Sequence, residues 1–521
     1  MASANAVHSH NRLTMANTIS FKKNIDSFFA AAIGAVLVLL FTHHAGIGIS
    51  PDSIVYTSAA RALNEGKGFT QFDNTPLIIF PVFYPGFLGT IQFITRVDVV
   101  QLTPYLNALI FATVIFISGC MLEIVNHTKW LKWIILSLIA FNPGLLEIYS
   151  MLWSETLFIV EILIFVWLCK KYFSDYSLKH LFLLGLIAAI SCDTRYAGVS
   201  VVATGGILLL VDHDRKWKQK IIHCIIYGSI AISFLTINLI RNYLSVKTLT
   251  GERQIGITPL NKNIEYYGTV LSDWLPFSTF MHRFPVTVGL TFFIAVFLIF
   301  IYQTIKKIEH NSFEKIAAAF TLMYSIFMMT TATLSRYEPI NSRLLSPFYI
   351  PCLFTVSFYT VHYIGYIKKL KLKIAASLFV SVLGLVILYQ YINNDRETFG
   401  DVNENGIGGY SEDEWMKAPL VKFIQKDSSV FKTELPVYSN SSHGVYFFTN
   451  HTLPTFPERV HLRDVAKFYS YPKTILIWFN NEGNDDILNL KEVTAQKKLT
   501  VLHHFSDGDI LLCESDSLMH K

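Results

Sequence analysis

Eleven apolar stretches alternate with short polar segments over the first 392 residues of the chain. Most of them approach the ~20 residues that a helix needs to cross ~30 Å of hydrocarbon. The pattern predicts a mainly α-helical, polytopic membrane protein with about eleven transmembrane helices. Their expected ranges are 27–44, 103–125, 131–149, 154–170, 178–193, 196–211, 220–240, 286–304, 315–333, 347–367 and 373–391.

A further apolar stretch, 83–95, is too short to cross, so we expect it to lie on the outer surface. Positively charged loops remain in the cytoplasm. With 83–95 outside, every strongly basic loop falls on one side, which predicts a cytoplasmic N-terminus and an external C-terminal tail. These basic segments contain Lys22 and Lys23, Lys129 and Lys132, Lys170 and Lys171, Arg215 to Lys220, Lys306 and Lys307, and Lys368 to Lys373.

The composition changes after residue 392. Short apolar runs such as 474–479 alternate there with amphipathic, helix-like segments such as 411–426. This alternation is typical of a small α/β domain. The expected organisation is therefore a cytoplasmic segment (1–26), a transmembrane catalytic domain with interfacial helices in its first outer loop (27–392), and a non-cytoplasmic α/β domain (393–521).

Composition supports the membrane assignment. Of the 521 residues, 52% are hydrophobic and 14% aromatic, and the mean hydropathy is +0.40. The net charge of +5 combines a tail of −6 (13 Lys/Arg against 19 Asp/Glu from Asn393 onward) with a membrane part near +11. Because the excess of basic residues lies in short loops, it indicates how the chain is oriented in the membrane and does not indicate nucleic-acid binding.

Cysteine usage and targeting signals bear on the compartment. The six cysteines form neither a disulfide pattern nor a CxxC metal motif. The first apolar stretch has no small-residue cleavage site after it, so we interpret it as an uncleaved anchor. The absence of disulfides and of a retention signal favours a bacterial inner (plasma) membrane, whereas Asn-x-Ser/Thr sequons at Asn440 and Asn450 leave an endoplasmic-reticulum membrane open.

The first outer loop carries the strongest candidate for chemistry. Asp52 follows Pro51, which can begin a helix and place the acid in its first turn. Tyr56 lies one turn further on, Arg61 follows on the same helix, and Lys67 stands in a Gly-Lys-Gly turn. An interfacial helix of this kind would present a carboxylate beside cations at the membrane surface. The alternative is a helix-terminal acid with no further role.

Four other charged residues fall near outer helix ends. Glu155 lies between two predicted spans, and Arg195 interrupts two more. Arg336 and Arg343 flank a short outer turn. Because external arginines do not serve orientation, we interpret them as anion ligands. The alternatives are a hydrated interfacial role for Glu155 and simple neutralisation of Arg195 by Asp193.

Acids and guanidinium groups on one side of a membrane suit transfer of a sugar from a lipid phosphate. An ionised carboxylate can take the proton of an acceptor hydroxyl. Arginine can stabilise the departing phosphate through two parallel hydrogen bonds. No paired-histidine or HExxH spacing occurs. We therefore expect no metal site and no required cofactor, although a divalent metal could serve the same purpose.

The chain resembles GT-C glycosyltransferases of the family-39, protein-mannosyltransferase-like kind, which includes the aminoarabinose transferases. The first-loop segments Asp52-Ser-Ile-Val-Tyr56 and Gly66-Lys-Gly-Phe69 carry the resemblance, together with the stretch 80–86 that contains Tyr84, Ser154-Glu155, and Arg343-Leu-Leu-Ser-Pro347. The resemblance implies a polyprenyl-phosphate-sugar donor, transfer on the non-cytoplasmic side, and usually inversion.

The resemblance also assigns residues. Asp52 corresponds to the family's first-loop acid and Glu155 to its second acid, while Tyr84 joins the candidate substrate-binding residues. Two departures matter: Ser53 replaces the second member of an Asp-Glu pair found in many members, and Glu155 stands where several relatives have Asp. The first departure argues against protein O-mannosylation.

The leading hypothesis is a glycosyltransferase that moves a hexose or pentose from a polyprenyl-phosphate donor to a hydroxyl of an unidentified lipid, glycan or protein. Asp52 would act as the base, and Glu155 would orient the acceptor or share that role. The alternatives are a transporter or flippase of a lipid-linked sugar, and a non-catalytic membrane scaffold. The sequence names neither the sugar nor the acceptor.

Overall fold

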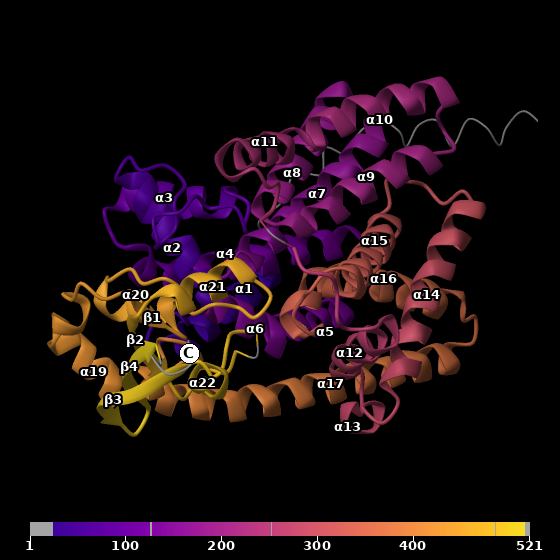
Figure 1. Ribbon diagram of the computed structural model, residues 1–521. Helices are drawn as coiled ribbons and strands as arrows, with labels where there is room; N and C mark the ends of the chain where they lie inside the picture. Colours follow the sequence, from indigo (N-terminus) through magenta and orange to yellow (C-terminus); the bar gives the residue numbers. More distant parts are fainter. Residues whose placement is uncertain (1–23, 126–127, 252, 485, 516–521) are drawn as a thin grey trace, which may run out of the picture.

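The computed structural model of the protein describes residues 24–125, 128–251, 253–484 and 486–515, so residues 1–23 of the expected segment 1–26 lie outside the described part. Each of the eleven predicted spans coincides with a helix or a pair of helices of one bundle (Figure 1). The bundle helices are α1 (Ile25–Phe41), α4 (Val99–Val125), α5 (Lys129–Ala140), α6 (Pro143–Ser150), α7 (Glu155–Asp175), α8 (Leu178–Thr194), α9 (Val199–Val211), α10 (Trp217–Ala231), α11 (Ser233–Val246), α14 (Pro285–Ile305), α15 (Phe313–Leu334), α16 (Ser342–Tyr366) and α17 (Leu370–Asn405).

The protein is a multi-span membrane protein. By length and composition, five helices of the described residues could each cross a membrane: α4, α14, α15, α16 and α17. Two bent helix pairs raise the number of candidate spans to seven. Helix α1 and the segment of α9 are shorter, and α7 carries several charged side chains. The structure therefore supports five to seven candidate spans by this criterion, compared with the eleven expected.

Two predicted spans are bent helix pairs and not single straight helices. The stretch 131–149 forms α5 and α6, whose axes differ by 47°. Asn142 caps α6 and Pro143 begins it. Because proline has no backbone N–H, the backbone hydrogen bonds of α5 cannot continue through this point. The stretch 220–240 forms α10 and α11, with a bend of 43°. There the Ser233 hydroxyl donates to the Ile230 carbonyl, a bond that favours bending.

Helix α17 extends beyond its predicted end. It runs from Leu370 to Asn405, so it passes through the expected domain boundary at 392/393 without a break. Only 6% of its most apolar window is buried, and the helix lies along one side of the bundle (Figure 1). Its apolar part is therefore placed to face lipid, while its polar end leads into the C-terminal domain.

The segment between α1 and α4 holds two short helices, α2 (Pro51–Asn64) and α3 (Phe83–Thr95). Helix α2 begins with Ser50, whose side chain accepts from the Ser53 amide in a capping box, and with Pro51 in the first turn. The stretch 83–95, expected to be too short to span, forms α3 and packs on α2. Gly89 allows this contact, because a Cβ there would lie 3.1 Å from the Ala60 carbonyl oxygen.

The C-terminal residues form the predicted α/β unit. Its four-stranded sheet has the order β1-β2-β4-β3, with β1 parallel to β2 and the other pairs antiparallel. A bulge between Val501 and His503 interrupts the register of β3 and β4. The elements are α18 (Asp413–Met416), α19 (Pro419–Lys426), β1 (Val437–Ser439), α20 (Ser442–Thr449), α21 (Leu462–Ser470), β2 (Lys473–Phe479), α22 (Leu490–Thr494), β3 (Lys497–Phe505) and β4 (Gly508–Ser515). Helices α12 (Leu260–Asp273) and α13 (Ser278–Met281) precede α14.

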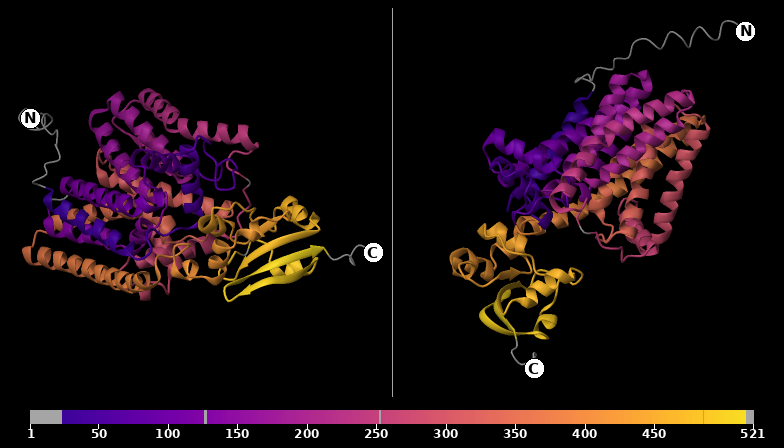
Figure 2. Two further views of the ribbon diagram at one scale, coloured as in Figure 1. Left: turned by 90° about the vertical axis from the view of Figure 1, so that its left-hand side faces the viewer. Right: turned by 45° about the horizontal axis from the view of Figure 1, so that its top comes forward.

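This C-terminal domain is packed against the first loop. A single hydrophobic cluster includes Tyr56 and Ile49 from the loop and Tyr410 and Ile477 from the domain. The Tyr410 amide donates to the Ile49 carbonyl at 2.8 Å. The domain therefore sits at one end of the bundle, where the first loop emerges (Figure 2).

Several basic loops gather at the opposite end of the bundle. Helix α1 begins there, and its Asp26 pairs with Lys129 and with the buried Lys132. Lys170, near the far end of α7, donates to the Asn311 carbonyl at 2.9 Å. The structure thus separates these predicted cytoplasmic loops from the C-terminal domain, as the charge pattern requires.

Candidate active site

Backbone pairing between two distant segments brings the first-loop acid toward Glu155. The Gly48 amide donates to the Ser150 carbonyl at 2.9 Å, and the Leu152 amide donates back to the Gly48 carbonyl at 3.0 Å. The Ser53 hydroxyl also donates to the Leu152 carbonyl at 3.0 Å. These bonds fix the start of α2 beside the start of α7, whose first residue is Glu155.

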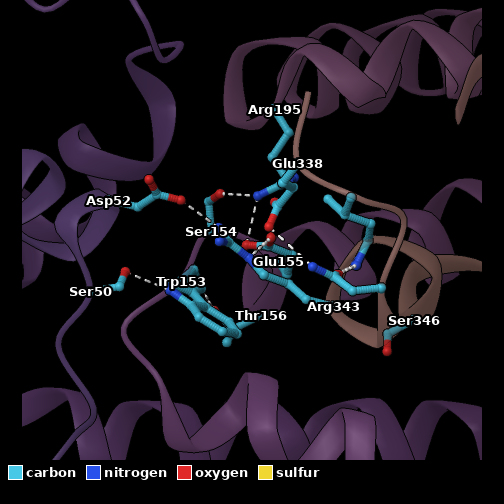
Figure 3. A network of polar contacts seen from close by, with 12 residues as sticks. Ser50, Asp52, Trp153, Ser154, Glu155, Thr156, Arg195, Glu338, Arg343 and Ser346 are labelled. Carbon is cyan, nitrogen blue, oxygen red and sulfur yellow. Dashed lines mark hydrogen bonds and ion pairs between the residues drawn. The ribbon is translucent and has the colours of Figure 1, made fainter. Parts of the chain in front are cut away.

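Two arginines join the acids into one network (Figure 3). Arg343, in the first turn of α16, donates through Nη2 to Asp52 Oδ2 at 2.6 Å and through Nε to Glu155 Oε1 at 2.5 Å. Arg195, at the end of α8, pairs through Nη1 with Glu155 Oε2 at 2.6 Å. The same Arg195 nitrogen donates to the Ser154 hydroxyl at 2.7 Å, which lies 3.2 Å from the Tyr56 hydroxyl.

The two acids have different environments. The side chain of Glu155 is fully buried, whereas that of Asp52 is 29% exposed. The guanidinium of Arg343 also stacks over the Trp153 ring, with its Cζ 4.0 Å from the ring centroid. The Trp153 indole in turn donates to the Ser50 hydroxyl at 2.8 Å. Glu155 and Trp153 therefore hold Arg343 in place, and Asp52 remains open to a ligand.

A cavity of about 590 Å³ opens onto this network. One part of its wall is polar and carries Asp52, Arg195, Arg343 and Glu338. Another part of the lining is apolar, because α9, α11 and α15 contribute Val199, Leu235, Leu239 and Phe327. A cavity with a cationic end and a hydrocarbon wall fits an amphipathic anion. Its lining further includes Tyr56, Ile79, Phe80, Pro81, Thr194, Tyr196, Ala197, Thr250, Arg253, Thr331, Ser335, Arg336 and Tyr337.

The structure sorts the predicted site residues into three groups. Asp52, Tyr56, Arg195, Arg336 and Arg343 line the cavity. The side chain of Glu155 lies behind its two arginines and does not line the cavity, and Tyr84 is buried with its ring against Tyr56. The third group lines a different cavity and consists of Arg61 and Lys67.

Arg336 has a partner in the C-terminal domain. Its guanidinium pairs with the Asp486 carboxylate, and Nε lies 3.1 Å from Oδ2. Arg61 makes two hydrogen bonds to Asp98, at 2.8 and 3.0 Å. These pairs show that two of the predicted cations already have carboxylate partners outside the central network.

Three participants were not among the predicted site residues. Trp153 and Ser154 precede Glu155 directly, and Glu338 lies in the short turn between Arg336 and Arg343. Burial raises the pKa of Glu338, Arg343 lowers it, and the nearby Asp52 raises it further. Proximity in sequence to the predicted residues was the signal that could have identified all three.

The described residues do not bring three His, Cys, Asp or Glu side chains together in a group able to hold a metal ion. Both acids of the network are instead paired with guanidinium groups. Positive charge for an anionic ligand is therefore available from arginine.

Comparison with solved structures identifies the fold. The crystal structure of ArnT from Cupriavidus metallidurans in the apo state superposes with a TM-score of 0.54 at 10% identity, covering 93% of this chain and 97% of that chain. The same ArnT bound to undecaprenyl phosphate gives the same score and coverage at 8% identity. This chain has the fold of ArnT. The predicted resemblance to GT-C membrane glycosyltransferases is thus confirmed at the level of the fold.

Other comparisons are weaker. Arabinosyltransferase EmbB from Mycobacterium smegmatis matches with a TM-score of 0.35 at 13% identity, covering 74% of this chain and 41% of that chain, and is too distant to bear on the fold. No protein-family model and no curated protein matches the chain in sequence.

Proposed function

We propose that the protein transfers a sugar from a polyprenyl-phosphate donor to a hydroxyl acceptor. The observation that carries this proposal is the cavity in which the Asp52 carboxylate and the Arg195 and Arg343 guanidinium groups meet an apolar wall. The likeness to ArnT, which has been solved with undecaprenyl phosphate, supports a donor of this class.

The donor phosphate would lie at the cationic end. Arg343 presents a flat guanidinium fixed by Trp153, and Arg195 lies next to it on the other side of Glu155. Arg253 also lines the cavity and adds positive charge, whereas the charge of Arg336 is balanced by Asp486. The polyprenyl chain would lie along the apolar wall formed by α9, α11 and α15.

Asp52 would act as the general base. In the structure its carboxylate pairs with Arg343 at 2.6 Å. A donor phosphate competes for the same guanidinium and would release Asp52. Asp52 then takes the proton of the acceptor hydroxyl, the acceptor oxygen bonds to the anomeric carbon, and the bond from that carbon to the phosphate oxygen breaks. Polyprenyl phosphate leaves, and attack from the opposite face inverts the sugar.

Glu155 has a different role in this proposal from the one expected from the sequence. A fully buried carboxylate with an arginine on each oxygen has no free face for an acceptor. We propose that Glu155 is a positioning residue that holds Arg195 and Arg343 at the spacing a phosphate requires.

The membrane arrangement belongs to the same proposal. All eleven predicted spans are helical in the bundle, and we propose that all eleven cross the membrane. The basic loops would face the cytoplasm, as the positive-inside rule requires, and the cavity with the C-terminal domain would face the opposite side. In a bacterium that membrane is the inner membrane.

The acceptor would approach through a groove that continues the main cavity. This groove, of about 710 Å³, shares Ile79, Thr250 and Arg253 with the cavity, and its lining also includes the first residues of α21. The C-terminal domain therefore borders the approach to Asp52.

The alternative to an enzyme is a transporter of the lipid-linked sugar. Transporters place ionisable residues in broken helices near the membrane midplane. Here Asp52, Glu155, Arg195 and Arg343 lie within the first turns or at the ends of their helices, beside the C-terminal domain. This position favours a reaction at the membrane surface.

The proposal is tested by mass spectrometry of lipids, surface glycans and proteins from cells that express the wild-type chain, Asp52→Asn or no chain. We expect a product carrying one added sugar only with the wild type. Asp401→Asn, an exposed acid on α17, is the matched control and should retain the product. The same product from the Asp52→Asn variant would refute the role of the base, and accumulation of translocated donor without product would favour the transporter.

A further inference from the structure

A second polar cavity lies between the first loop and the C-terminal domain. It has a volume of about 530 Å³ and is lined by the second half of α2, the turn that follows it, and residues 446–452. Asp52 lies in the first turn of α2, and Arg61 lies nine residues later, about 13 Å along the helix. The two cavities are therefore separate. The Thr452 hydroxyl donates to the Phe72 carbonyl at 2.8 Å and joins the two walls.

The charges in this second cavity are already paired. Of its lining residues, three are charged: Arg61, Glu65 and Lys67. Arg61 is held by two hydrogen bonds to Asp98, and Lys67 pairs with Glu65 at 2.6 Å. A phosphate would have to displace a carboxylate to bind here. The cavity differs from the catalytic one in its lining, which carries one guanidinium group where the catalytic cavity carries four.

The remaining polar lining is neutral and can both donate and accept hydrogen bonds. Gln71, Asn74 and Asn450 contribute amide groups, and the half-buried Tyr446 contributes an aromatic ring. Asn74 and Asn450 have φ angles of 61° and 55°, a backbone conformation that by itself favours asparagine. Backbone conformation accounts for the residue type at these two positions and not for the presence of Gln71 and Tyr446 in the same lining.

We propose that this cavity binds a neutral saccharide unit. Sugar hydroxyls donate and accept, as side-chain amides do, and the C–H face of a sugar ring packs on an aromatic ring. Both basic side chains of this lining have carboxylate partners, and the amides and the tyrosine ring supply the contacts for a neutral ligand. The inference goes beyond the proposed transfer reaction, because saccharide binding here requires neither the donor nor Asp52.

Saturation-transfer NMR on the full chain in phosphatidylcholine nanodiscs tests the proposal without sugar-headed detergents. The probes are methyl α-glucoside, methyl α-mannoside, methyl β-galactoside and N-acetylglucosamine, with inorganic phosphate as competitor. We expect at least one sugar to bind the wild type. Tyr446→Ala and Asn74→Gly should each weaken that binding about three- to tenfold, the range expected for one lost polar or stacking contact. Asn74→Gly keeps the positive φ without strain.

Control variants separate this site from the catalytic cavity and from misfolding. Asp52→Asn and the exposed Gln425→Ala should bind the sugar as the wild type does, and Tyr446→Phe should retain most of the affinity because it keeps the ring. If Tyr446→Ala does not fold, the sugar affinity of Asn74→Gly tests the proposal. The proposal is overturned if no probe binds, if binding is unchanged in Asn74→Gly, or if phosphate displaces the sugar. Loss of transfer in Asp52→Asn with intact sugar binding distinguishes the two proposals.

Discussion

Replacing Glu155 by glutamine tests whether this acid positions two arginines or takes part in the chemistry. The variant keeps the shape of the side chain and removes its charge. Glu155 is fully buried, and Arg195 and Arg343 are each only 13% exposed. Removing one partner of a buried ion pair costs about 3–5 kcal/mol, because the remaining charge is left uncompensated. We therefore expect Glu155→Gln to unfold at a clearly lower temperature than the wild type.

The matched comparison is Asp52→Asn. Asp52 is 29% exposed and pairs with Arg343 at 2.6 Å, while Arg343 keeps its bond to Glu155. Losing a partly exposed pair changes stability by about 1 kcal/mol or less. Each substitution removes one negative charge next to Arg343. A large difference in stability between the two variants would therefore come from the burial of Glu155 and from its second partner, Arg195.

The assay is thermal unfolding of the purified chain in lipid nanodiscs, with and without undecaprenyl phosphate. A ligand present at about 100 times its Kd stabilises a protein by about 2.7 kcal/mol. In Glu155→Gln, Arg195 loses its carboxylate partner and Arg343 keeps only Asp52. The two guanidinium groups are then no longer held at the spacing a phosphate requires, so the phosphate should bind less tightly and raise the unfolding temperature less than in the wild type. Unfolding at the wild-type temperature, or an equal rise in both proteins, would refute the positioning role.

Three further predictions concern the same cavity. Arg343→Lys loses the flat, two-pronged geometry, so transfer should fall about tenfold or more while the chain stays inserted; unchanged transfer would contradict this. Burial raises the pKa of Glu338, so lowering the pH removes its negative charge earlier than for an ordinary glutamate, and undecaprenyl phosphate should bind more tightly. Glu338→Gln should flatten the pH dependence of Kd, leaving only the part due to the lipid phosphate. Arg336→Ala breaks a pair whose side chains are 29% and 37% exposed, so the unfolding free energy should change by about 1 kcal/mol or less, measured by denaturant titration.

Much of the fold could be predicted from the sequence, because the length and apolar content of a segment indicate directly whether it forms a membrane helix. All eleven stretches became helices, and Pro51 placed Asp52 in the first turn of α2 as expected. External arginines at helix ends have few structural purposes, and Arg195, Arg336 and Arg343 indeed line one cavity. The bend within 131–149 was missed although Asn142-Pro143-Gly144 is a turn signal, because the apolar pattern resumes directly after it. The bend within 220–240 was missed because the apolar pattern continues through it.

The partners of each side chain depended on tertiary packing. Arg343 meets an acid 291 residues away and another 188 residues away, and no local pattern encodes such distances. Packing also buried Glu155 and turned Arg61 toward a second cavity. The sequence by itself determined which segments are apolar helices and which charges lie at their ends. Only the folded bundle decided which of those charges meet, because contacts between helices depend on how their surfaces pack together.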